Sequence, residues 1–371
     1  MKPAPRLNWI DYARGIAIIL VTYRHVFEGV KAAGIPVGNF PFLEYINIFF
    51  YSFRMPLFFI VSGIFISRSF KKRGLLNYIE ARAKMILYPY FIWGFMQLTL
   101  QMFFTKYTNG HPTPAAYLHL LYLPREIGQF WYLYALFNVS ILYVFSKQLK
   151  FTVVYNIIIG LIFFYISALV YQYDIKIGFL SDILHNYIFF AIGDLVSNYL
   201  LDRKNHKYFE SGKILLLMLI PFAAVQFYFL MANLQQQIQK YMFVEYYQPF
   251  IFLLIAIIGC AFIINLTFFL QKKDRLKWLT YVGRHSLYIY VAQVIAFAGL
   301  RIFLTNVLHI QNIFIILITG IIAGVCIPLL LYRLAVKLNM RWIFTLEKED
   351  STEVKKPVTA AVAFENRANN L

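Results

Sequence analysis

Residues 13–29, near the start of the chain, read ARGIAIILVTYRHVFEG. The apolar run in this stretch is of the kind that crosses a lipid bilayer as a helix. Charged and titratable side chains nevertheless stand in or beside it, at Arg14, Arg24, His25 and Glu28. Ionisable groups are costly inside a membrane and usually serve a function there. This one helix therefore predicts both the class of protein and the place of its site.

The composition of the whole chain also indicates a membrane protein. Hydrophobic residues make up 60% of the sequence and charged residues 14%, whereas about a quarter of the residues in soluble domains are charged. The formal net charge of +18 does not indicate a nucleic-acid partner, because Lys and Arg gather in short links between apolar segments. Cys260 and Cys326 lie in apolar runs without metal-ligand spacing, so we predict packing roles and no metal.

Ten apolar segments, each near the roughly 20 residues that span the hydrocarbon, predict an all-α bundle of about ten transmembrane helices. They lie at about 12–30, 45–68, 84–105, 129–146, 151–172, 183–201, 213–232, 248–270, 279–304 and 311–336. Lys and Arg are abundant in every second link and sparse in the others. By the positive-inside rule, this alternation supports the count of ten and places both termini in the cytoplasm.

The remaining segments complete the predicted organisation. Residues 1–346 form one membrane-embedded domain, and residues 347–371 have the polar, mixed-charge composition of a disordered cytoplasmic tail. The longest outer link, 106–128, contains an apolar stretch too short to span, so we expect an interfacial or re-entrant segment that acts as a lid. The sequence shows no internal repeat and no Walker, Rossmann, zinc or nucleophile-elbow pattern.

The spacing of Arg14 and His25 indicates a chemistry. Eleven residues separate them, so both project from nearly the same helix face, about 16 Å apart along the axis. The topology puts Arg14 at the cytoplasmic edge and His25 past the midplane. Coenzyme A matches this spacing, with its phosphates on Arg14 and its thioester near His25, which could carry the acyl group or deprotonate a hydroxyl. The plainer alternative is a membrane anchor at Arg14 and a packing residue at His25.

Four blocks of the sequence resemble the acyltransferase 3 family of integral membrane acyltransferases. LNWIDYARGIAIILVTYRHV, residues 7–26, is similar to the first helix of that family, with its Arg and its later His. FRMPLFFIVSGIFI, residues 53–66, resembles the second helix. QFWYLYALF at 129–137 and VGRHSLYIYVAQ at 282–293 resemble later blocks. The similarity covers nearly all of residues 1–340.

The resemblance implies transfer of an acyl group, most often acetyl, from cytoplasmic acyl-CoA to a hydroxyl of a surface or envelope carbohydrate. It implies a multi-pass protein of a bacterial inner membrane. Arg14 and His25 carry over as essential residues, with Arg14, Arg82 and Lys84 as donor-binding residues. The family often has an arginine pair where this chain has Arg82 and Lys84, and a late histidine where it has Gln293. The first departure leaves the donor contacts open, and the second removes a titrating group from the position of Gln293.

Further candidates follow from single residues. Arg54 lies in the second segment at a depth that matches His25, and we predict that it holds the acceptor or developing negative charge. Glu28, Trp131, Tyr132 and Gln293 are the residues that we expect to contact the acceptor. For the two aromatic residues, a belt at the membrane boundary is the competing interpretation.

Other polar or small residues have two possible roles or none that can be assigned. Ser62 and Gly63 either admit the donor arm or allow another helix to pack closely. Asp194, Asn265 and Arg301 are candidates for buried polar groups, and the sequence does not assign a partner to any of them.

Two other classes of function stay open. A transporter or flippase for a lipid-linked saccharide also places Arg and His inside the membrane, although the repeat symmetry of many transporters is missing. A structural partner in a polysaccharide-export complex is the weaker alternative. Labelling of an envelope polymer that depends on acyl-CoA separates the enzyme from both.

Overall fold

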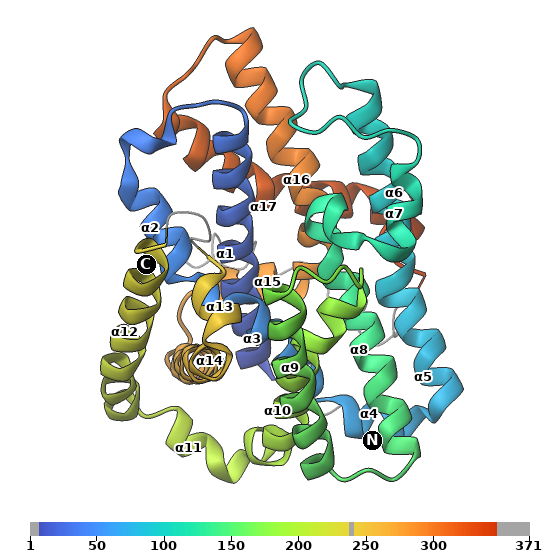
Figure 1. The fold of residues 1–371 in the computed structure, drawn as a ribbon, viewed down its shortest axis with the longest axis vertical. Coiled ribbons are helices and arrows are strands. Elements are labelled where there is room, and N and C mark those ends of the chain that lie inside the picture. The colour runs from blue at the N-terminus through green and yellow to red at the C-terminus, as the bar shows by residue number, and fades with distance from the viewer. Residues whose placement is uncertain (1–6, 237–240, 347–371) are drawn as a thin grey trace, which may run out of the picture.

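The computed structural model describes residues 7–236 and 241–346, and the regular secondary structure in these ranges is helical throughout (Figure 1). The predicted all-α class is thereby confirmed. The predicted tail, 347–371, lies outside the described residues.

Each of the ten predicted apolar segments carries one of the longer helices. These helices are α1 (Asn8–Ala32), α3 (Tyr51–Gly63), α6 (Tyr88–Phe103), α8 (Trp131–Gln148), α9 (Val153–Gln172), α10 (Leu180–Leu201), α12 (Gly212–Leu234), α14 (Pro249–Lys273), α16 (Ser286–Ile302) and α17 (Ile313–Lys337). The short helices between them are α2 (Pro41–Phe49), α4 (Ile66–Arg73), α5 (Leu75–Arg82), α7 (Ala116–Tyr122), α11 (His206–Phe209), α13 (Phe243–Tyr247) and α15 (Lys277–Arg284). Short 3-10 helices are η1 (Val37–Asn39), η3 (Pro124–Phe130), η4 (Arg203–Asn205) and η6 (Arg341–Ile343). Single π-helical turns are η2 (Ala83–Leu87) and η5 (Phe303–Val307).

Seven stretches of the described helices are long and apolar enough to cross a bilayer. They are Pro41–Arg73, Pro124–Gln148, Val153–Gln172, Gly212–Leu234, Pro249–Lys273, Ser286–Val307 and Ile313–Lys337. Helices α1, α6 and α10 do not qualify on these grounds, and in α1 the reason is its charged residues. The structure is thus a helical bundle of the multi-pass membrane class, and the count of ten spans stays a prediction.

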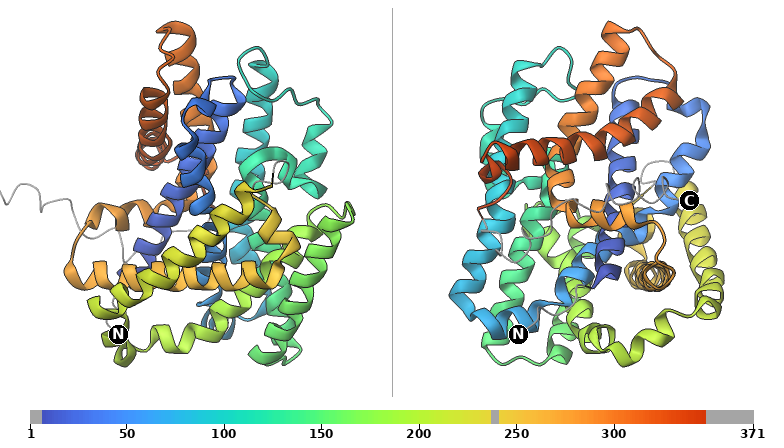
Figure 2. Two further views of the ribbon diagram at one scale, coloured as in Figure 1. Left: turned by 60° about the vertical axis from the view of Figure 1, so that its left-hand side comes forward. Right: turned by 180° about the vertical axis from the view of Figure 1, so that it is seen from behind.

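Helix α1 runs through the middle of the bundle (Figures 1 and 2) and packs against α3, α14, α15, α16 and α17. The helices cross at steep angles, since α14 appears nearly end-on in Figure 1 but lies across the left view of Figure 2. At its first turn, the backbone NH of Trp9 donates to Gln271 Oε1 (2.9 Å). Near its last turn, the carbonyl of Gly29 accepts from Asn109 Nδ2 (3.0 Å). Gln271 begins a basic link on the predicted inner side, and Asn109 stands in the 106–128 link on the predicted outer side. Links of opposite predicted sides therefore contact opposite ends of α1.

Backbone-to-backbone packing sets the position of α3 against α10. A Cβ added to Gly63 would lie 2.1 Å from the carbonyl oxygen of Phe190, and one added to Gly193 would lie 2.2 Å from that of Ile60. No larger residue fits this crossing. The two interpretations of the Ser62–Gly63 pair therefore divide between neighbours: Gly63 packs against another helix, and Ser62 lines a cavity.

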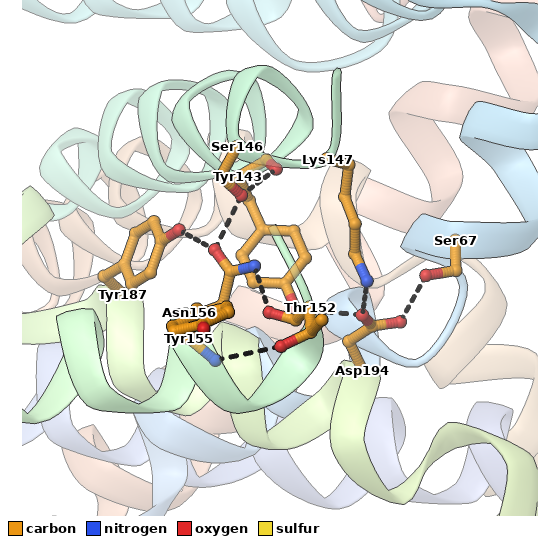
Figure 3. Close-up of polar contacts among 9 residues, drawn as sticks. All are labelled: Ser67, Tyr143, Ser146, Lys147, Thr152, Tyr155, Asn156, Tyr187 and Asp194. Atoms are coloured by element: carbon orange, nitrogen blue, oxygen red, sulfur yellow. Dashed lines mark hydrogen bonds and ion pairs between the residues drawn. The ribbon is translucent and has the colours of Figure 1, made fainter. Parts of the chain in front are cut away.

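A buried carboxylate joins α4, α8 and α10 (Figure 3). Asp194, only 6% exposed, is 2.7 Å from Lys147 Nζ and accepts hydrogen bonds from Tyr143 (2.9 Å) and Ser67 (2.6 Å). Beside it, Asn156 accepts hydrogen bonds from hydroxyl groups of α8 and α10. The partners that the sequence could not assign to Asp194 are thus three side chains, and their contacts tie the three helices together.

Candidate active site

Four arginines from distant parts of the chain line a small cavity of about 210 Å³ near the start of α1. Arg14 comes from α1, Arg82 from α5, Arg284 from α15 and Arg341 from η6. Guanidinium groups offer fixed, forked donors that suit phosphate and carboxylate groups. The inner cavity, as we call it, therefore has the chemistry of an anion-binding site.

A close helix crossing brings Arg284 to Arg14. A Cβ added to Gly283 would lie 1.7 Å from the carbonyl oxygen of Asp11, so α15 rests directly on the backbone of α1. The Asp11 carboxylate, almost fully buried, lies 3.2 Å from the Nε of Arg284. This carboxylate holds Arg284 at the cavity. Asp11 also stands three residues before Arg14, a spacing at which helical side chains can meet.

Only one of the two basic residues predicted after the second helix lines the inner cavity. Arg82 does so, with its Nε donating to the Tyr78 hydroxyl (2.8 Å). Lys84 is not among the residues that line this cavity, and its half-exposed side chain is paired with Glu80 one helical turn earlier.

A larger cavity of about 1000 Å³ lies toward the other end of α1 and is lined by His25 and Glu28. Apolar residues of α6 and α16 form part of its wall. Twelve residues of the 106–128 link, including Thr108 and Asn109, form another part, and two of the twelve, Ala116 and His119, stand in short α7. The outer cavity, as we call it, combines apolar walls with a few convergent polar groups, as small-molecule sites do.

One hydrogen bond lies between the two cavities. Tyr290 lines the inner cavity, Gln129 lines the outer one, and the Tyr290 hydroxyl donates to the backbone carbonyl of Gln129. The side-chain amide of Gln129 in turn donates to Gln97 Oε1 (2.7 Å), and the rings of Tyr290 and Tyr132 meet edge to face at 5.2 Å. We call this contact the partition, because it joins a residue that lines one cavity to a residue that lines the other.

Hydrogen bonds tie Glu28 of α1 to α2 and α3, one helical turn after His25. Glu28 Oε1 accepts from Asn47 Nδ2 (3.2 Å), and Asn47 Oδ1 accepts from Arg54 Nη1 (2.9 Å). Arg54 is 1% exposed, and its Nη2 has no hydrogen-bond partner among the described residues. The guanidinium groups of Arg24 and Arg54 lie near enough to act on the imidazole electrostatically. His25 thus lines a cavity and is subject to the positive charge of these two arginines.

The predicted acceptor residues divide between the cavities and the interior. Glu28 lines the outer cavity, but Tyr132 lines the inner one. Trp131 lies outside both linings, with the Arg125 guanidinium 4.4 Å from its ring centre. Gln293 is fully buried, and its Oε1 accepts from the Thr22 hydroxyl at 2.5 Å.

Sequence reasoning overlooked several residues that line the cavities. Arg284 and Tyr290 lie in the 282–293 block. The block as a whole resembles the family, but the sequence predicted no site role for either residue. Arg341 is one of the basic residues that mark the inner side after the last apolar segment, and the sequence predicted no site role for it. Arg301 was noted as a candidate buried group, and the structure places it in the lining of the outer cavity.

Comparison with known proteins adds one finding to this geometry. The family model of an acyltransferase domain, that of acyltransferase 3, matches residues 7–333. The match includes α1, both ends of the partition and three of the four arginines. No curated protein and no solved structure matches the chain. A match of this extent, on a bundle with apolar helices of membrane-spanning length, shows that the chain belongs to the acyltransferase 3 family and is a membrane acyltransferase.

Proposed function

We propose that the protein is an O-acyltransferase, with acetyl the favoured group, that moves the acyl group from cytoplasmic acyl-CoA to a hydroxyl of an envelope carbohydrate. The bacterial inner membrane is the matching location. The observation that carries the proposal is the pair of cavities at two levels of α1, one lined by four arginines and the other by His25.

The inner cavity supports the donor half of the proposal. Its volume of about 210 Å³ is below the 300 Å³ or so at which pockets hold drug-sized ligands, so it would take phosphate groups rather than all of coenzyme A. The pantetheine arm would then point along α1 toward His25, about 16 Å away along the axis. To reach it, the thioester would pass Tyr290 and Gln129.

The outer cavity supports the acceptor half. A hydroxyl bound there would give its proton to His25 as its oxygen attacks the thioester carbonyl. The new carbon–oxygen bond forms and the carbon–sulfur bond breaks. Coenzyme A leaves as a thiolate, and this thiolate takes the proton from the imidazolium. Arg54 lines neither cavity, so it would act on the charge that develops on the carbonyl oxygen from the interior of the bundle, through its field and not through a direct hydrogen bond.

The test uses the purified protein in neutral detergent with radiolabelled acetyl-CoA and envelope glycan. We expect base-labile label on the glycan, and none with His25→Ala or His25→Gln, because glutamine forms hydrogen bonds but does not carry the proton. His309→Gln is the matched control, since His309 is exposed and lines neither cavity. It should transfer like the wild type.

Three results would contradict parts of this proposal. No label with any acyl-CoA would refute acyl transfer to glycan and favour a transporter. Near-normal transfer by His25→Gln would make the imidazole a packing group. An acyl-imidazole trapped with donor alone would overturn the general-base role and replace it with a covalent one.

A further inference from the structure

Arg301 is a buried cation that faces the outer cavity without a counter-ion among the described residues. It stands in the last turn of α16 and is 8% exposed. Its Nε is buried and lacks a hydrogen-bond partner, and no carboxylate in residues 7–236 or 241–346 lies within ion-pair distance of the guanidinium.

The carboxylates of the same cavity already have other partners. Glu28 accepts a hydrogen bond from Asn47, and Glu126 lies 3.3 Å from His119 Nδ1. The groups nearest to Arg301 along α16 are apolar, among them Phe297 and Ala298. Burying a charge in such surroundings is unfavourable when nothing neutralises it. An anion that enters the cavity would supply the missing counter-charge.

The position of Arg301 along the cavity follows from helix contacts. α1 and α16 run in the same direction, because Thr22 contacts Gln293 and, further along both helices, Gly29 packs on the Phe297 ring. His25 lies one turn before Gly29, and Arg301 lies one turn after Phe297. Counted from the first contact, Arg301 lies five residues further along than His25, and counted from the second it lies eight residues further. At 1.5 Å a residue, Arg301 therefore lies about 8 to 12 Å beyond His25 along the helix direction.

We infer that the outer cavity binds an acceptor with an oxyanion, a phosphate or a carboxylate, and that Arg301 holds this anion further along the cavity than His25, where the hydroxyl is acylated. The inference rests on the proposed function for the identity of the acceptor, but the binding of an anion can be measured without any acyl transfer.

The experiment measures binding by calorimetry to the full chain in neutral detergent, with no acyl donor present. The probes are trigalacturonate, maltotriose phosphate and, as the neutral counterpart, maltotriose. We expect Arg301→Gln to weaken binding of at least one anionic probe about ten- to a hundred-fold, the loss of one charged hydrogen bond, with maltotriose unaffected. Arg203→Gln, which alters an exposed arginine outside both cavities, should bind all three like the wild type.

Thermal unfolding provides a second readout, because a folding defect would lower the stability of the variant, whereas loss of an anion site would not. Without a probe, Arg301→Gln should be at least as stable as the wild type, because an uncompensated buried charge is removed. A lower unfolding temperature would show a structural partner and overturn the inference. So would equal binding of the anionic probes by wild type and variant, or Arg301-dependent stabilisation by phosphatidylglycerol micelles alone, which would make Arg301 a lipid anchor. If the anions bind but no glycan is acylated, only the proposed function fails.

Discussion

Replacing Gly283 with alanine should damage the inner cavity from outside it. The added Cβ would lie 1.7 Å from the Asp11 carbonyl oxygen and 2.9 Å from the Gly15 nitrogen. Ordinary contact begins at about 3.4 Å, so α15 has to retreat from α1 by about 1.7 Å. Overpacking of this kind costs about 1–3 kcal/mol. The retreat also lengthens the 3.2 Å pair between Arg284 and Asp11 beyond ion-pair distance.

Two measurements check this prediction. The unfolding temperature of Gly283→Ala should fall, and its KM for acyl-CoA should rise about ten-fold or more as one charged contact to the donor is misplaced. Gly38→Ala is the control, because Gly38 is exposed and, apart from its chain neighbours, no atom of the described residues lies within 4 Å of the position that the added methyl group would take. Wild-type stability and donor KM in Gly283→Ala would refute both the close crossing and its role in placing Arg284.

Three further predictions concern the topology and the two cavities. A reporter in 106–128 should be external and one in 202–213 cytoplasmic by accessibility labelling, and the same side for both would contradict the ten-helix arrangement. Arg14→Ala should raise the KM for acyl-CoA at normal membrane abundance, and Arg14→Lys should restore it only in part, because an ammonium lacks the forked donor; an unchanged donor dependence would remove the phosphate role. Tyr290→Phe removes the hydroxyl that donates to the Gln129 carbonyl, so water should reach the thioester more easily. Hydrolysis of acyl-CoA without acceptor, measured as released thiol, should therefore rise, and an unchanged rate would mean that the partition does not exclude water.

The sequence was most informative where the relation between residues is local. Helix periodicity alone puts Arg14 and His25 on one face about 16 Å apart, and the structure assigns them to two separate cavities. Local geometry also explains Lys84, because Glu80 one turn earlier is within its reach. The spacing of four residues could have shown this pair in advance.

The remaining features depend on contacts between distant segments. Arg284 reaches Arg14 because Gly283 permits a crossing that neither segment predicts alone. Arg341 joins the same cavity from beyond α17, and no pattern in its own sequence separates it from an ordinary inner-side anchor. The partition likewise pairs a hydroxyl with a backbone carbonyl, a partner that every residue offers. Such pairings follow from the fold and not from residue type.

The buried Asp194 pair has a consequence for how the chain is made. A helix that carries Asp at its centre partitions poorly from the translocon into lipid, at a cost of about 3 kcal/mol for that residue. α10 carries Asp182 as well as Asp194, and α8, two helices earlier, brings Lys147 and Tyr143. Lys147 stands in the last turn of α8 and Asp194 past the middle of α10, so the ion pair between them forms only after α10 has been made. Biogenesis of this protein should consequently depend on the order of these helices, and a chain that ends before α10 should leave Lys147 without its carboxylate partner.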